Sequence, residues 1–258
     1  MYNFKMTISY DGERYNGWQK QGNTENTIQG KLESILSKYF EENIEVAGSG
    51  RTDAGVHAMN QIANFKVHEN NKNIKTNLND NTVDVVRIRD EINRYLPKDI
   101  SIKKVEIVDE RFHSRLNANS KHYRYTVDCG AVARVFERKY VYRMEEKPDV
   151  ELMKSATSYF VGEHDFMAFQ ANKKIKKSTV RNIEKIDITY KEGILTFDYF
   201  GDGFLYNMIR IITGTLLEIG LGKRKIDDID RIFASRDRSK AGYLVPASGL
   251  MLMEVFYD

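Results

Sequence analysis

The chain has very little cysteine and no long apolar run. Cys129 is the only cysteine among 258 residues, which excludes an intrachain disulfide and a Cys-x-x-Cys metal site. The most apolar segment, residues 204–221, is interrupted by Asn207, Arg210 and Glu218, and no stretch approaches the roughly 20 apolar residues of a membrane-spanning helix. No signal peptide precedes the first strand-like run. We therefore expect a soluble, cytoplasmic protein that does not contact a membrane.

The chain also has little excess of either sign of charge. Forty Lys and Arg residues face thirty-seven Asp and Glu residues, a formal net charge of +3, which is too mild to prove a nucleic-acid partner. The basic residues nevertheless crowd into 134–143, 173–177 and 231–240. Such local tracks are compatible with a phosphate-bearing partner, although solvated surface lysines explain them equally well from charge alone.

The first half of the chain has a regular alternation of strand and helix patterns. Apolar and polar residues alternate at the start, as in a strand, and Thr27 precedes a run with helical spacing that it can cap. The order β-α-β-β-α-β predicts the split βαβ pattern of a ferredoxin-like unit. The expected elements are strands over 3–10, 44–47, 61–67 and 100–108, and helices over 28–39 and 85–96, the second ended by Pro97.

The second half repeats this theme less regularly. Its expected elements are strands over 123–127, 180–190, 194–200 and 251–257, and helices over 152–160 and 205–219. We therefore predict an α+β protein with two ferredoxin-like halves, residues 1–109 and 110–258. The halves would form a wide, mostly antiparallel central sheet with helices on one face and a positively lined catalytic cleft between them.

The segment Gly48–Ala58 is the most informative part of the chain, because three glycines surround Arg51-Thr52-Asp53. Glycine allows close approach of another molecule at an entropic cost, so we expect Asp53 at a working surface. Arg51 can keep that carboxylate ionised, and an ionised carboxylate can act as nucleophile, general base or metal ligand. The structural alternative is a turn residue whose side chain bonds the loop backbone.

Spacing argues against two of the common site types. His57 lies four residues from Asp53 with no companion histidine or cysteine at ligand spacing, and His113, His122 and His164 are scattered, so we predict no metal site. Ser49 lacks the Gly-x-Ser-x-Gly elbow of a serine hydrolase.

The stretch Gly50–Ala58 resembles the catalytic loop of the TruA family of tRNA pseudouridine synthases. Further motifs of that family match in order and spacing. They are Tyr10–Gly12, Tyr15, Gly17–Gln19, Asn93, Leu96–Pro97, Ile100, Arg111–Arg115, Lys121, Tyr123–Tyr125, Gly162–Phe166, Phe169, Gly203–Arg210 and Pro246–Leu250. One departure is Leu116, where the family more usually has an aromatic residue after the arginine.

The resemblance implies a role for four residues. Asp53 matches the aspartate that attacks the target uridine, at the ribose or at the base, and Arg51 matches the arginine that helps flip the nucleotide. Tyr123 matches the tyrosine that stacks on uracil, and Arg210 matches the arginine that pairs with the aspartate. From pattern alone, Tyr123 alternates with core-like Tyr125 and would face the core, whereas Arg210 sits in an apolar helix and needs an acidic partner.

The function implied by the resemblance is isomerisation of uridine to pseudouridine in the anticodon stem-loop of tRNAs, at positions 38–40, without a cofactor. The partners implied are tRNA and a second copy of the chain in a homodimer, and Lys173–Lys177 becomes a plausible phosphate contact. The alternatives are a paralogue acting on another uridine or RNA, a non-catalytic RNA-binding relative, and a nucleoside hydrolase or glycosidase. The last normally needs a second working acid, which the sequence does not reveal.

Overall fold

The computed structural model describes residues 1–258 except 75, 77–81 and 173–177, so the predicted Lys173–Lys177 contact lies outside the described residues. The chain divides into two compact units. The first comprises Met1–Asn119 together with Leu252–Asp258, and the second comprises Ser120–Met251. The last strand therefore folds mainly with the beginning of the chain.

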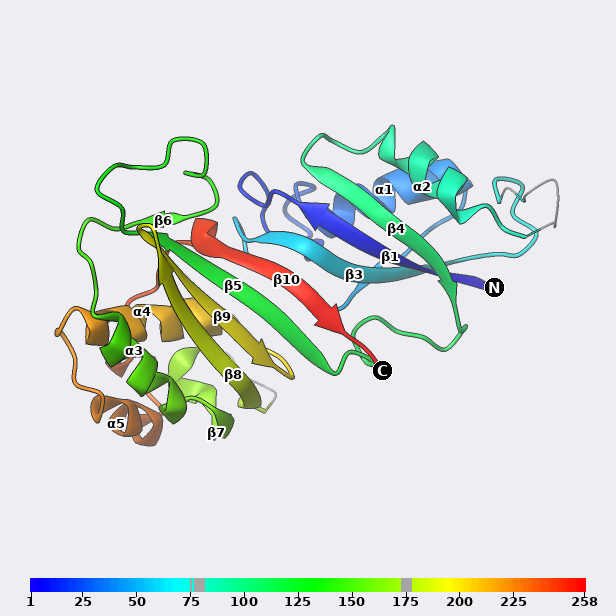
Figure 1. Cartoon of the computed structure of the whole chain (residues 1–258). Helices are drawn as coiled ribbons and strands as arrows, with labels where there is room; N and C mark the ends of the chain where they lie inside the picture. The colour runs from blue at the N-terminus through cyan, green and yellow to red at the C-terminus, as the bar shows by residue number, and fades with distance from the viewer. Residues whose placement is uncertain (75, 77–81, 173–177) are drawn as a thin grey trace. The chain divides into compact units, whose positions relative to one another are not determined.

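The first unit contains an antiparallel sheet with two helices (Figure 1). Strand β4 pairs with β1, β1 pairs with β3, and β2 pairs with β3, all antiparallel. β10 lies next to β3 in the strand order. The elements are β1 (Tyr2–Tyr10), α1 (Ile28–Phe40), β2 (Ala47–Gly48), β3 (His57–Val67), α2 (Val85–Asn93), β4 (Ile100–Val108) and β10 (Leu250–Phe256).

One face of this sheet is buried because apolar residues alternate along its strands. Phe4, Met6 and Ile8 of β1 are fully buried, and the Phe4 ring stacks 5.2 Å from Phe65 and 6.3 Å from Phe40 of α1, between ring centroids. α1 begins as predicted, since the Thr27 hydroxyl accepts a hydrogen bond from Gly30 N at 3.2 Å.

Three predicted boundaries in this unit were wrong. Residues 44–47 do not form a strand, because the backbone N–H groups of Ile44 and Val46 donate to Ser37 Oγ and Glu33 Oε1 of α1 instead; the strand is Ala47–Gly48. β3 begins at His57 rather than residue 61, and α2 ends at Asn93 rather than 96. The strand prediction over 100–108 is confirmed.

The second unit has a sheet in the order β5-β9-β8-β7, with antiparallel pairs throughout and β6 added parallel to β5. Strands β5, β9 and β8 thus follow the same order as β1, β3 and β2 in the first unit. The elements are β5 (Ser120–Asp128), β6 (Tyr142–Arg143), α3 (Val150–Ala156), β7 (Gly162–Asp165), β8 (Val180–Lys191), β9 (Ile194–Gly201), α4 (Met208–Gly220) and α5 (Asp228–Ser235).

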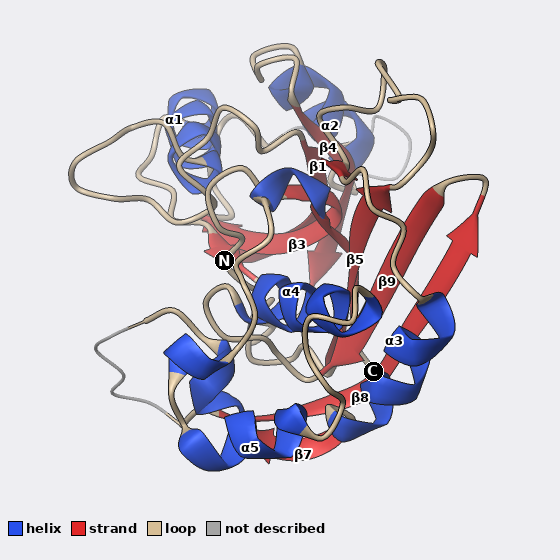
Figure 2. Cartoon of the chain, turned by 90° about the vertical axis from the view of Figure 1, so that its left-hand side faces the viewer, coloured by secondary structure: helices blue, strands red, loops and turns tan. Residues whose placement is uncertain are grey.

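Helix α4 is the central helix of this unit. All of its residues except Arg210 and Glu218 are buried, as expected of a helix that is apolar on all sides. It lies against the sheet (Figure 2), where Thr213 Oγ1 is 2.7 Å from Tyr199 OH of β9. The protein is therefore α+β with mostly antiparallel strands. In the described part of the chain, no helix is long and apolar enough to cross a membrane.

Candidate active site

The loop that carries Asp53 leaves β2 at Gly48 and enters β3 at His57. Its backbone is bonded to the segment after β1: Trp18 N donates to Thr52 O at 3.0 Å, and Gly55 N donates to Tyr15 O at 3.4 Å. Thr52 is 6% exposed, whereas Asp53 is half-buried and Arg51 is exposed. The loop therefore holds its middle residue inward and leaves the residues on either side accessible.

Two of the loop glycines are needed for different reasons. Gly55 has φ +80°, a left-handed conformation that other residues avoid. At Gly48 an added Cβ would lie 2.6 Å from the indole of Trp18, which is only 2% exposed. Trp18 is thus a packing residue beneath the loop.

Four buried polar side chains, Ser49, Gln61, Tyr10 and Thr52, form what we call the Gln61 network below the loop. The Gln61 amide bonds Ser49 Oγ at 2.6 Å, Gly50 O at 3.1 Å and Tyr10 OH at 3.4 Å. Tyr10 OH lies 2.8 Å from Thr52 Oγ1. Burial raises the pKa of Tyr10 far above its ordinary value, so its phenol stays neutral and serves the network as a hydrogen-bonding group.

The histidine near the loop is structural. His57 is 1% exposed and its Nδ1 accepts a hydrogen bond from Gly12 N at 3.1 Å. This contact ties the start of β3 to the turn after β1. Among the described residues, no group of three or more His, Cys, Asp or Glu side chains is arranged to hold a metal ion.

Tyr123 lies on β5 in the second unit, opposite Tyr199 of β9. It is 7% exposed, and its ring meets Phe204 edge to face, with centroids 5.4 Å apart at 81°. The strand alternation therefore buries Tyr123 with Tyr125 within the unit, and Phe204 fixes the tilt of its ring.

Arg210 lies in the first turn of α4 and its guanidinium is held at two points. Its Nη1 donates to Asn207 Oδ1 at 2.8 Å and its Nε donates to Val245 O at 2.8 Å. Asn207 is 7% exposed and is the N-cap residue of α4, with φ 62°. Asparagine tolerates this left-handed conformation better than most residues, so one residue both starts the helix and orients the arginine.

The four predicted site residues thus fall in two sets. Arg51 and Asp53 share a loop of the first unit, and Tyr123 and Arg210 belong to the second. Sequence reasoning missed Gln61, which bonds the loop backbone at Gly50, and Asn207, which bonds Arg210. The available signal for Gln61 was a glutamine in a strand position where alternation calls for an apolar residue.

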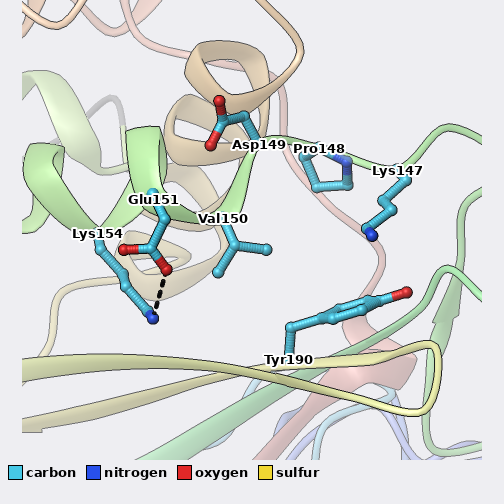
Figure 3. A pocket seen from close by; sticks show the side chains of 7 residues that line it. All are labelled: Lys147, Pro148, Asp149, Val150, Glu151, Lys154 and Tyr190. Atoms are coloured by element: carbon cyan, nitrogen blue, oxygen red, sulfur yellow. Dashed lines mark hydrogen bonds and ion pairs between the residues drawn. The ribbon is translucent and has the colours of Figure 1, made fainter.

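A separate hollow lies in the second unit, between the start of α3 and the β8–β9 hairpin, with a volume of about 440 Å³ (Figure 3). Lys147 Nζ lies 4.7 Å from the centroid of the Tyr190 ring there, and Lys154 pairs with Glu151 at 2.8 Å. None of the four predicted site residues lines it.

The family model described as tRNA pseudouridine synthase matches residues 6–117 and 156–258. This match includes Arg51, Asp53 and Arg210 but leaves out 118–155, where Tyr123 lies. A solved chain of a Cbf5–Nop10–Gar1 complex is 12% identical, with a TM-score of 0.38, over 96% of this chain and 48% of its own. That level of likeness by itself defines neither fold nor function.

Relatives of known name match along the whole length, including 118–155. The tRNA pseudouridine synthase A of Bacillus sp. (strain KSM-64) is 46% identical over 252 residues, 98% of each chain. The tRNA pseudouridine synthase A 2 of Bacillus cereus (strain ATCC 14579) is 42% identical over 99% of each chain. The tRNA pseudouridine synthase A of Acetivibrio thermocellus is 41% identical over 100% of each. The chain belongs to the TruA family of tRNA pseudouridine synthases.

Proposed function

We propose that the protein is an isomerase that converts uridine to pseudouridine in the anticodon stem-loop of tRNAs, at positions 38–40, in the cytoplasm. Full-length similarity to tRNA pseudouridine synthases supports the reaction class. The observation that carries the assignment is the Asp53 loop. It holds an accessible carboxylate next to the exposed Arg51, and the buried hydrogen bonds of the Gln61 network support the loop from below.

The reaction is an internal rearrangement. The bond between uracil N1 and ribose C1′ breaks, the uracil turns, and a bond forms between uracil C5 and C1′. The hydrogen on C5 is lost and N1 gains one, so neither a redox step nor an external group is involved and no cofactor is needed. We assign the attack to the Asp53 carboxylate, at the ribose or at the base.

The four residues act on one flipped nucleotide in this proposal. The half at 1–109 contributes Asp53 and Arg51, and the half at 110–258 contributes Tyr123 and Arg210. Flipping a base costs a few kcal/mol, and an aromatic platform such as Tyr123 returns about 1–3 kcal/mol. The two arginines stabilise the charge of Asp53 and of the detached uracil.

The nucleophile assignment is tested with unmodified tRNA carrying tritium at uracil C5. Wild-type protein is expected to release the tritium, and the Asp53→Ala variant is expected to release none while still binding tRNA. Binding without release by the wild type would identify a non-catalytic RNA-binding relative. Release by Asp53→Ala would show that the nucleophile is another residue.

The position of the new pseudouridine tests the substrate assignment separately. Chemical mapping of the product tRNA should place the modification at 38, 39 or 40. A modification elsewhere, or turnover only on another RNA, would identify a paralogue with a different target. Free uracil in place of pseudouridine would identify a hydrolase.

We further propose that the enzyme works as a homodimer, because one chain carries a net charge of only +3 for a large polyanionic substrate. The loop between β5 and β6 supports this, since Val132, Val135 and Phe136 are 82%, 64% and 90% exposed. Asp128 holds this loop through Gly130 N and Arg134 N at 3.0 and 3.2 Å.

A second copy fits the β5–β6 loop because Glu137 and Arg138 beside Phe136 offer both signs of charge for a self-complementary contact. Phe136→Asp is expected to halve the molar mass measured by light scattering. A monomeric wild-type protein would contradict the proposed dimer. A Phe136→Asp variant that remains dimeric would contradict the proposed location of the interface.

A further inference from the structure

Gln61 is a polar residue in an apolar row. On β3 it shares a face with Ala63 and Phe65, because strand side chains alternate, and it lies opposite Ile8 of β1. Its side chain is 0% exposed. A buried amide without partners costs about 1–3 kcal/mol, so a leucine would be the simpler choice for folding at this position.

The partners of Gln61 define the direction of its amide. The Gly50 carbonyl can only accept a hydrogen bond, so the Gln61 Nε2 group faces it at 3.1 Å. The opposite end, Oε1, accepts from Ser49 Oγ at 2.6 Å. The second Nε2 hydrogen points to Tyr10 OH at 3.4 Å.

Tyr10 carries the link onward to the catalytic loop. The Tyr10 hydroxyl accepts from Gln61 and shares a hydrogen bond with Thr52 Oγ1, 2.8 Å away. Burial keeps the Tyr10 phenol neutral by raising its pKa, so the hydrogen is retained. Gln61 is therefore connected to Gly50 directly and to Thr52 through Tyr10, which are the two neighbours of Arg51.

A β-bulge contributes to this arrangement. Ile8 pairs with Gln61 and Tyr10 pairs with Ala58, so between these points one residue of β1, Ser9, faces two of β3, Met59 and Asn60. Bulges re-aim side chains and are frequent next to active sites. Here the extra residue lies between the strand position that holds Gln61 and the end of β3 that leads into the catalytic loop.

We propose that Gln61 is a positioning residue for the isomerisation: it fixes the backbone at Gly50 and Thr52 and so aims the Asp53 carboxylate at the uridine. This inference rests on the proposed function. Gln61 acts only through the loop, because it is fully buried. A misplacement of about 1 Å at a reacting group can cost about 100-fold in rate, whereas tRNA affinity depends mainly on phosphate contacts elsewhere.

The test separates rate from binding. Gln61→Leu is expected to lower the single-turnover rate of tritium release about 10- to 100-fold at saturating tRNA, with the Kd for tRNA within about twofold of wild type. The matched control is Asn93→Leu, which removes another amide whose two hydrogen bonds, both 2.8 Å, go to Ile102 of β4. It should lower the melting temperature and leave the rate unchanged.

A second pair of variants tests the link if Gln61→Leu does not fold. Thr52→Val removes the hydroxyl that meets Tyr10, and Thr52→Ser keeps it. The valine variant should lose about 10-fold in rate, and the serine variant should stay within about threefold of wild type. In addition, Tyr10→Phe and Gln61→Leu together should lose less than the product of their separate losses, because they break one connection.

The contrary outcomes are distinct. A folded Gln61→Leu with wild-type rate, while Asp53→Ala is inactive, overturns the inference and leaves the proposed function standing. Equal slowing by Asn93→Leu, or a loss confined to tRNA binding, shows a merely structural role and also overturns it. Turnover by Asp53→Ala overturns the inference and the nucleophile assignment together.

Discussion

The two regions that carry the predicted site residues hold them in opposite ways. Asp53 lies on a loop that has no regular structure of its own, and the loop is fixed from below by the buried Gln61 network and by Trp18. Arg210 lies on the most buried helix of the protein and is fixed by Asn207 and Val245 at its own helix end. The conformation of the loop therefore depends on side-chain hydrogen bonds. The position of Arg210 depends instead on a helix whose burial in the core stabilises it independently of the site.

The largest effect in this comparison is expected at Arg210. Arg210→Met should lower the single-turnover rate by at least about 100-fold, because removal of a group that stabilises developing charge typically costs 10²–10³. The single-turnover assay with C5-tritiated tRNA measures it. Arg210→Lys, which keeps the charge but loses the two-point fork, should recover only part of the rate. A methionine variant within about fivefold of wild type would remove Arg210 from the site.

A smaller effect is expected at Asn207, where three variants separate backbone from side chain. Asn207→Gly keeps the left-handed conformation but loses the acceptor for Arg210 Nη1, and should lose about 10-fold in rate, about 1.4 kcal/mol. Asn207→Asp keeps the acceptor and should stay closer to wild type. Asn207→Ala should also lower the melting temperature, because alanine resists φ 62°. Equal rates for glycine and wild type would show that Val245 alone orients Arg210.

Gly48→Ala tests the packing under the loop. The added methyl would lie 2.6 Å from the Trp18 indole, which has no free space to move because it is buried. Such overpacking should destabilise the protein by about 1–3 kcal/mol, measured by chemical denaturation, with a smaller effect on the rate than Arg210→Met. A variant as stable as wild type would mean that the loop and Trp18 separate easily, which would contradict a rigid packing of the loop on Trp18.

The smallest effect on catalysis is expected at Asp198, on the sheet face opposite Tyr123. Burial opposes its charge, but hydrogen bonds from His122 and Arg124, at 2.6 and 2.8 Å, hold the pKa of Asp198 below its ordinary value. A lowered pKa stabilises the folded state above the unfolded pKa of about 3.9, and this contribution is lost as the pH falls through the folded pKa.

Asp198→Asn should therefore be less stable than wild type near pH 7, and the difference should shrink below about pH 4. Urea denaturation at a series of pH values measures it, and the rate of tritium release should not change. A constant difference across that pH range would show that the carboxylate contributes no charge-dependent stability.

The sequence predicted the elements best where one periodic pattern decided them. The capped helix after Thr27 and the strand over 100–108 are confirmed, because local signals and core packing agree there. The strand over 44–47 was wrong because side chains of α1 take its backbone hydrogen bonds, a competition between distant residues that no local pattern contains.

The site shows the same division. The glycine-rich loop around Asp53 was found from residue types and the motif around Arg210 from the family resemblance, but the roles of Gln61 and Asn207 were missed. The role of Gln61 follows only from its hydrogen bonds to Ser49, Gly50 and Tyr10, which lie 11 to 51 residues away along the chain. The role of Asn207 depends on a left-handed backbone that its residue type permits but does not demand.

The most direct test of the central claim is a single-turnover measurement with Asp53→Asn, which keeps the size of the side chain and removes the nucleophilic charge. We predict that this variant binds C5-tritiated tRNA with a Kd within about twofold of wild type and releases no tritium. Release within about tenfold of the wild-type rate would contradict the claim that the Asp53 carboxylate carries out the reaction.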